Sequence, residues 1–181
     1  MERAMEQAKR PVTGLAGRYG HPLHPALVAV PIGTWIASFV FDIASHLIPN
    51  PGFLTQGSRW LIALGVLSAL AAAMFGFLDL FAIPTGTKAF RTGLVHMSIN
   101  LGVTVLYAVG FIIRGGAAAG PVGWIPLALS AVALAGLGVA GYLGGKLAYH
   151  YGVRVADEAT QAAGYTRTTT SKSTTSKEER V

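Results

Sequence analysis

Residues 60–83 read WLIALGVLSALAAAMFGFLDLFAI and contain a single charged side chain, that of Asp79. A helix rises about 1.5 Å per residue, so this run is long enough to cross the roughly 30 Å of hydrocarbon in a bilayer. Similar runs occupy Ala26–Ile48, Phe90–Ile113 and Val122–Tyr149. Strands are a poor interpretation because no run alternates steadily between apolar and polar residues, and helices satisfy their own backbone groups in lipid. We therefore expect four membrane-spanning helices.

The composition also indicates a membrane protein. Hydrophobic residues make up 52% of the 181 residues and charged residues only 12%, against about 25% charged in ordinary soluble domains. The connections between the apolar runs are short and rich in proline and glycine, which favours neighbouring antiparallel helices. No internal repeat is apparent beyond a shared richness in Ala, Gly and Leu in the second and fourth runs. The sequence predicts an all-α fold, an antiparallel four-helix transmembrane bundle.

Basic residues are concentrated on one side of the predicted topology. Of the 14 lysines and arginines, all but Arg59 and Arg114 precede the first helix, lie in the second connection, or fall at or beyond the end of the fourth helix. The positive-inside rule then places both termini in the cytoplasm. The net charge of +6 is interpreted as this topology signal and not as nucleic-acid binding. With no cysteine in the sequence, disulfides and thiolate metal sites are excluded.

The chain is predicted to have three parts. Residues 1–20 are polar and basic and form a cytoplasmic N-terminal segment, residues 21–155 form the transmembrane domain, and residues 156–181 form a mobile cytoplasmic tail. From Thr166 onward the sequence has almost nothing apolar to bury, so ordering it could not offset the conformational entropy lost.

Ionisable side chains inside the spans are the clearest chemical clue, since burying them in lipid is costly and usually marks function. His21 and His24, in the sequence GHPLHP, stand where the first helix begins. Asp79 and His96 lie within about 12 Å of the ends of their helices on the same side of the membrane. Asn100 follows His96 by one helical turn and shares its face. We expect these groups to form one cluster near the cytoplasmic side.

Other polar and small residues are weaker candidates. His150, at the end of the fourth run, lies on the same side as the cluster. Asp42 and His46 are four residues apart near the opposite side, where Arg59 could approach, and are interpreted as an interfacial ion pair. Gly141 and Gly145 have helix-packing spacing and favour either a dimer face or packing inside the bundle.

Three interpretations of the cluster stay open. His24, His96 and Asp79 could bind a divalent metal such as zinc, iron or manganese, with Asn100 orienting His96. Two histidines among His21, His24 and His96 could instead be axial ligands of a b-type haem between facing helices. The third interpretation is a satisfied polar network that holds the helices in register.

Several function classes are disfavoured. The sequence lacks the motifs of catalytic triads, phosphate-binding loops and zinc proteases, so an enzyme is not indicated. A proton-coupled transporter using Asp79 and His96 is a less favoured alternative, because four short-looped helices show no broken-helix pairs. A structural scaffold or interaction subunit without a cofactor is the main alternative to a cofactor-binding protein.

A series of ordered motifs resembles a known family. The motifs are HPLHPALV at 21–28, PIG at 31–33, GFLD at 76–79, IPTGT at 83–87, His96 with Asn100, and GYLGG at 141–145. Together they resemble the bacterial four-span membrane family called domain of unknown function 2231, over about residues 20–155. Relatives fused to Rieske-type iron–sulfur or cytochrome c modules imply a membrane partner for electron-transfer proteins. The resemblance thus favours an accessory redox component of the bacterial inner membrane.

Overall fold

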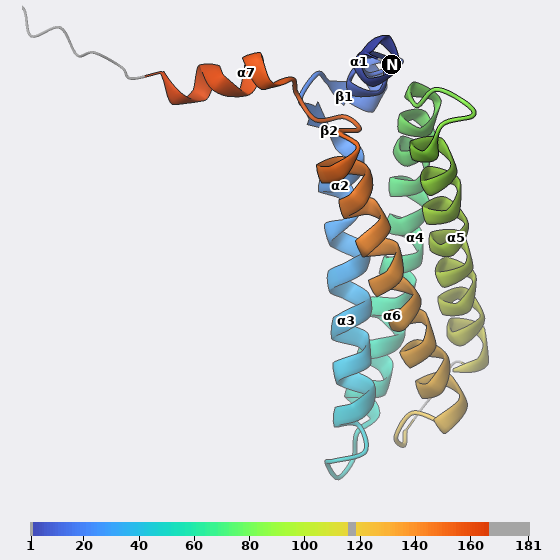
Figure 1. Cartoon of the computed structure of the whole chain (residues 1–181). Helices are drawn as coiled ribbons and strands as arrows, with labels where there is room; N and C mark the ends of the chain where they lie inside the picture. The colour runs from blue at the N-terminus through green and yellow to red at the C-terminus, as the bar shows by residue number, and fades with distance from the viewer. Residues whose placement is uncertain (1, 116–118, 167–181) are drawn as a thin grey trace, which may run out of the picture.

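The computed structural model describes residues 2–115 and 119–166. Its long helices run antiparallel and side by side as a bundle (Figure 1). The first span consists of two segments, α2 (Leu23–Leu27) and α3 (Ala29–Ala44). The second and third spans are α4 (Gly52–Ala82) and α5 (Lys88–Ile113). The fourth span is α6 (Trp124–Gly145), which continues as one π-helical turn, η2 (Lys146–His150). Four helical segments are long and apolar enough to span a membrane, which confirms the predicted transmembrane bundle.

The four spans are arranged as a ring in chain order. α3 packs against α4 and α6, and α5 packs against the same two helices, so α3 and α5 face each other diagonally. The core residues between the helices are Trp35, Ile62, Val103, Tyr107 and Ala133. Large apolar side chains cover the outside of the bundle as well. Such an extensive apolar exterior is the surface expected of a protein that contacts lipid.

The helix α4 begins at Gly52, whereas the apolar run predicted a start at Trp60. Its first turns are polar because they face the bundle interior and not the solvent. Thr55 donates a hydrogen bond to the Gly120 carbonyl, and Ser58 is fully buried. Arg59, predicted in the connection, therefore lies within the helix and places its guanidinium 4.6 Å from the centre of the Phe111 ring.

Local sequence explains where the first and third spans begin. Pro22 precedes α2 and Pro25 lies in its first turn, where a backbone N–H would have no partner inside the helix. Pro31 cannot donate to the Leu27 carbonyl, and the helix is interrupted at that level, between α2 and α3. The third span begins after Thr87, whose hydroxyl accepts a hydrogen bond from the Phe90 amide as an N-terminal cap.

Segments before the first span and after the fourth form a cap over one end of the bundle, the end where α2 begins (Figure 1). We define the cap as residues 2–22 and 151–157. The N-terminal side comprises α1 (Glu2–Lys9), the short helix η1 (Gly14–Ala16) and the antiparallel strands β1 (Gly17–Arg18) and β2 (His21–Pro22), in which Gly17 pairs with Pro22 and Arg18 with His21. Arg154 joins the two sides, since its amide donates to the Ala8 carbonyl.

The predicted tail, residues 156–181, begins with two short helices. Residues 158–165 form the helices α7 (Glu158–Ala162) and η3 (Ala163–Tyr165), which project sideways from the bundle (Figure 1). Asp157 caps α7 by accepting from the Thr160 amide and also bonds the Tyr19 hydroxyl at 2.8 Å. The rest of the predicted tail, residues 167–181, lies outside the described residues.

The two helical hairpins share some of their contacts. Three pairs of side chains meet between the first and third spans, and the partners in each pair lie 72 positions apart: His24 with His96, Trp35 with Tyr107, and Asp42 with Arg114. A constant separation is expected where two parallel helices pack in register. The likeness extends to the other two spans at the histidines, because His24 and His96 bond the carbonyls of Ala72 in α4 and Ala140 in α6.

Candidate functional site

Two imidazoles face each other near the capped end of the bundle. The ring centres of His24, in α2, and His96, in α5, are 6.3 Å apart and the ring planes are perpendicular. His24 Nδ1 lies 2.9 Å from the Ala72 carbonyl oxygen, and His96 Nδ1 lies 2.9 Å from that of Ala140. A carbonyl can only accept, so each Nδ1 carries a proton, and in a neutral ring the lone pair then lies on Nε2.

Glycine makes room for each imidazole on the neighbouring helix. Gly76 follows the Ala72 carbonyl by one turn, and a Cβ there would lie 2.8 Å from His24 Cε1. Gly144 has the same relation to Ala140, and a Cβ there would lie 3.1 Å from His96 Cε1. The first distance is a clash and the second a tight contact. The two hairpins therefore hold their histidines by the same device, a carbonyl and a glycine one turn apart.

The other predicted members of the cluster are placed differently. Asn100 Nδ2 lies 3.2 Å from His96 Nε2 and donates to the His96 carbonyl at 2.9 Å, which supports its predicted role beside that histidine. His21 is exposed in β2, with Nδ1 3.3 Å from the Tyr19 carbonyl. Among the described residues, no hydrogen bond or ion pair joins Asp79 to either imidazole, and no group of three His, Asp or Glu side chains is arranged to hold a metal.

Asp79 has a different partner, which the sequence interpretation did not assign to it. Its Oδ1 accepts from Arg154 Nε at 2.6 Å, and Arg154 Nη2 donates to the Ala16 carbonyl at 2.8 Å. The Arg154 side chain is 3% exposed. This ion pair ties α4 to both halves of the cap, directly above the histidine pair.

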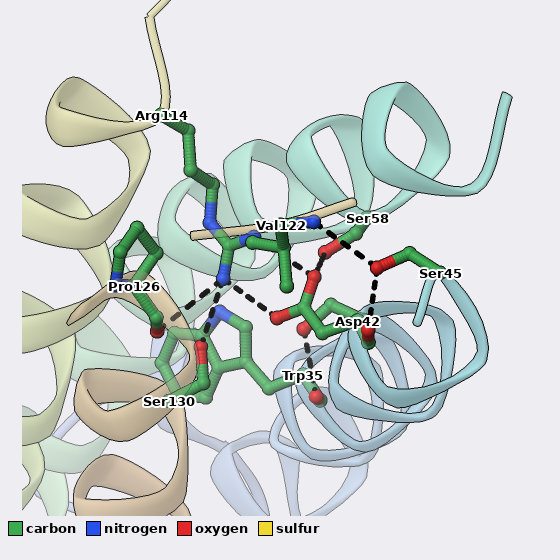
Figure 2. A network of polar contacts seen from close by, with 9 residues as sticks. Trp35, Asp42, Ser45, Ser58, Arg114, Val122, Pro126 and Ser130 are labelled. Carbon is green, nitrogen blue, oxygen red and sulfur yellow. Dashed lines mark hydrogen bonds and ion pairs between the residues drawn. The ribbon is translucent and has the colours of Figure 1, made fainter. Parts of the chain in front are cut away.

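A second polar cluster fills the opposite end of the bundle (Figure 2). Both carboxylate oxygens of Asp42 accept from Arg114, at 2.8 Å from Nη1 and 2.6 Å from Nη2, and Oδ1 also accepts from the Ser58 hydroxyl. Arg114 Nη2 donates further to Ser130 Oγ at 3.1 Å. Asp42 is 0% and Arg114 2% exposed, so the pair is fully buried.

The predicted Asp42–His46 ion pair is therefore wrong. Asp42 points into the bundle and bonds Arg114 from the third connection, while the His46 ring stacks on Trp124 at 4.6 Å between ring centres. α3 ends at Ala44, so the helical spacing that predicted the pair does not extend to His46, and Asp42 is buried whereas His46 is only half-buried. The Arg59 guanidinium is directed to an aromatic ring instead.

Trp35 and Tyr107 lie between the two polar clusters. Their rings stack with centres 4.2 Å apart and planes 10° from parallel. Gly65 on α4 provides the space, because a Cβ there would overlap the Trp35 indole. Neither Trp35 Nε1 nor the Tyr107 hydroxyl has a hydrogen-bond partner among the described residues, so the centre of the bundle contains polar atoms without direct protein contacts.

A family model described as "Predicted membrane protein (DUF2231)" matches residues 20–157. The chain belongs to the DUF2231 family. The matched region contains both hairpins, the histidine pair and both buried ion pairs. No curated protein and no solved structure matches the chain. The family description gives a membrane location and no activity, so the chemistry of this DUF2231 protein has to be argued from its own residues.

Sequence reasoning missed the two buried arginines of the DUF2231 chain that pair with Asp42 and Asp79, Arg114 and Arg154. A signal for both existed, since a carboxylate inside a span needs a cation to compensate it. The choice of cation was not evident, because Arg114 was interpreted only as a connection residue and Arg154 as one of many basic residues near the termini. The glycines Gly141 and Gly145 also differ from the bundle-packing interpretation: a Cβ at Gly141 would meet nothing within 4 Å, and one at Gly145 only Tyr149 of its own segment.

Proposed function

We propose that this DUF2231 protein binds a b-type haem through His24 and His96 and serves as an accessory component of membrane electron transfer in the bacterial inner membrane. The observation that carries the proposal is the pair of imidazoles, one from each hairpin, at 6.3 Å and perpendicular to each other. Facing helices of bundles commonly hold cofactors between them. When bound, a haem would supply reversible one-electron chemistry.

The separation of the rings suits two ligands on one metal ion. A metal–imidazole bond is about 2 Å long and the coordinating nitrogen lies about 1 Å from the ring centre, so two imidazoles on opposite sides of an ion have centres about 6 Å apart. Each Nδ1–H is already held by a backbone carbonyl, as metal-ligating histidines usually are. In a neutral ring, that arrangement leaves the lone pair that a metal requires on Nε2. At His96, ligation would replace the contact of Nε2 with Asn100 Nδ2, which lies 3.2 Å away.

The number of ligands favours haem iron over a zinc-like site. Structural zinc sites use about four protein ligands and catalytic sites about three. The described residues bring together two imidazoles, with the Asp79 carboxylate occupied by Arg154. Haem iron needs only two axial ligands from the protein because the macrocycle supplies the others.

The position of the histidines near one end of the bundle supports electron exchange at one membrane surface. His24 lies at the start of its span and His96 within the first few turns of α5, on the side of both termini. The distribution of lysine and arginine supports a cytoplasmic location for that side. A single redox centre there would serve a partner at the same surface and would not by itself connect the two sides.

The test is the haem content of variants purified in parallel from cells supplied with haem, and after reconstitution with haem b. The wild-type protein should contain about one haem, and His24→Ala and His96→Ala should each lose most of it. The double variant should lose little more, because a site already abolished cannot be lost twice. His21→Ala and His150→Ala are matched controls outside the pair and should retain haem.

A structural network is the rival explanation, since the same imidazoles connect α2 to α4 and α5 to α6. Under that explanation the wild-type protein stays free of haem after reconstitution, while His24→Ala and His96→Ala unfold more readily in detergent. That result would overturn the proposal. Retention of haem by both single variants would overturn the ligand assignment.

A further inference from the structure

Arg154 is unusual among the charged residues of the cap. It is 3% exposed and uses Nε for Asp79 and Nη2 for the carbonyls of Ala16 and Gly17. Its remaining nitrogen, Nη1, is buried and has no hydrogen-bond partner among the described residues. The residue also has a positive φ of 60°, a conformation that costs a non-glycine residue about 1 kcal/mol or more. The fold thus maintains a strained, buried guanidinium whose Nη1 has both N–H groups without a partner among the described residues.

This guanidinium lies close to the histidine pair, on its outer side. Its partner Asp79 follows Gly76 by three residues on α4, and Gly76 is the residue against which the His24 ring packs. Three residues of helix correspond to about 4.5 Å along the axis. Asp79, to which Arg154 Nε bonds, therefore lies nearly one helical turn beyond Gly76 in the direction of the capped end of the bundle.

A haem b carries two carboxylates on one edge, and their charge is costly to bury in hydrocarbon. With His24 and His96 near the capped end, those carboxylates are expected to point toward that end. Arginine N–H groups are preferred partners of carboxylates. We propose that Arg154 Nη1 donates a hydrogen bond to a propionate carboxylate of the haem, an inference that rests on the proposed function.

The role of Asp79 in this arrangement is to position Arg154. It accepts the Nε–H and compensates the charge, so the ion pair as a whole is neutral and Nη1 acts as an oriented donor. A hydrogen bond to a charged group contributes enough to change affinity by about tenfold to a hundredfold. The preference for a carboxylate over a neutral ester should be of that size.

The experiment titrates the haem-free protein in detergent with two probes, haem b and its dimethyl ester, which has the same macrocycle and iron but no free carboxylate. Binding is followed by the visible absorption of the bound group. The wild-type protein should bind haem b about tenfold to a hundredfold more tightly than the ester. Arg154→Gln should reduce this preference to near unity by weakening haem b binding alone, and Arg154→Lys should retain part of it. Arg91→Gln, an exposed cation at the same end, should leave the preference unchanged.

The outcomes separate this inference from the proposed function. Equal wild-type affinity for haem b and the ester would overturn the role of Arg154 and leave the histidine ligation standing. Binding of neither probe would overturn the proposed function itself. If Arg154→Gln fails to fold, the comparison of the two probes on the wild-type protein still decides the question, because it requires no substitution.

Discussion

Replacing Asp42 by asparagine should strongly destabilise the bundle, because it leaves Arg114 with an uncompensated charge in the interior. The carboxylate accepts two hydrogen bonds from Arg114 and one from Ser58, and the ion pair is almost fully inaccessible. Removing one partner of such a pair costs about 3–5 kcal/mol. At about 1.4 kcal/mol per factor of ten, the unfolding equilibrium should shift by roughly a hundredfold to several thousandfold.

The assay is equilibrium unfolding of the purified protein in mixed micelles with increasing denaturing detergent, followed by circular dichroism. Glu6→Gln is the matched control, since its ion pair with Arg10 is exposed by 43% and 66% and should contribute under about 1 kcal/mol. The double variant Asp42→Asn/Arg114→Met should be more stable than Asp42→Asn alone, because it no longer buries an unpaired charge. The reasoning is refuted if Asp42→Asn unfolds like Glu6→Gln, or if the double variant loses the sum of the two single losses.

Three further predictions test other parts of the structure. Gly76→Ala should destabilise the protein by about 1–3 kcal/mol in the same unfolding assay, because the added Cβ would clash with His24. Gly138→Ala, where a Cβ meets nothing within 4 Å, should be neutral or slightly stabilising. Equal effects of the two substitutions would contradict the packing described. The Thr160 amide and the Tyr19 hydroxyl lower the pKa of Asp157 to about 2. The stabilisation of α7 by the Asp157 carboxylate is therefore complete above the ordinary pKa of 3.8 and is lost as the pH falls through 2. Tyr19→Phe should raise the pKa of Asp157 measured by carboxyl carbon NMR, and an unchanged pKa would exclude the contact. Because the chain has no cysteine, the single variants Pro49→Cys and Thr85→Cys can each be labelled specifically. An impermeant maleimide should label Pro49→Cys in intact cells, but Thr85→Cys only in opened membranes. The reverse labelling pattern would show that the topology is inverted.

The transmembrane architecture could be predicted because it depends on properties of each segment taken by itself. Run length and hydropathy set the number of spans, and short connections set their antiparallel order. The start of α4 was misplaced for an equally local reason. Thr55 and Ser58 look like connection residues in sequence, but they are polar because they face buried partners from other segments.

The contacts between the first and third spans were not predictable from the sequence, since the partners lie 72 positions apart. Their chemistry is clear once the pairs are seen in contact. Two histidines face each other, tryptophan stacks on tyrosine, and arginine compensates the charge of a buried aspartate.

The Asp partners were not predictable because depth in the membrane does not determine which face of a helix meets which neighbour. Asp79, His24 and His96 were placed at similar depth, yet Asp79 bonds Arg154 from the segment after α6. Asn100 was placed correctly beside His96 because both lie on one helix, where a spacing of four residues fixes the geometry. Contacts within a helix follow from spacing, whereas contacts between segments require the packed structure.

The cap has a consequence for the order in which the protein is made. Arg154 connects segments separated by nearly the whole chain, since it bonds backbone carbonyls of Ala8, Ala16 and Gly17. Synthesis proceeds from the N-terminus, so all four spans have been produced before Arg154 is available to close the end of the bundle. The ion pair with Asp79 and the contacts between the two sides of the cap are therefore late steps of assembly, which form only after the whole bundle has been synthesised.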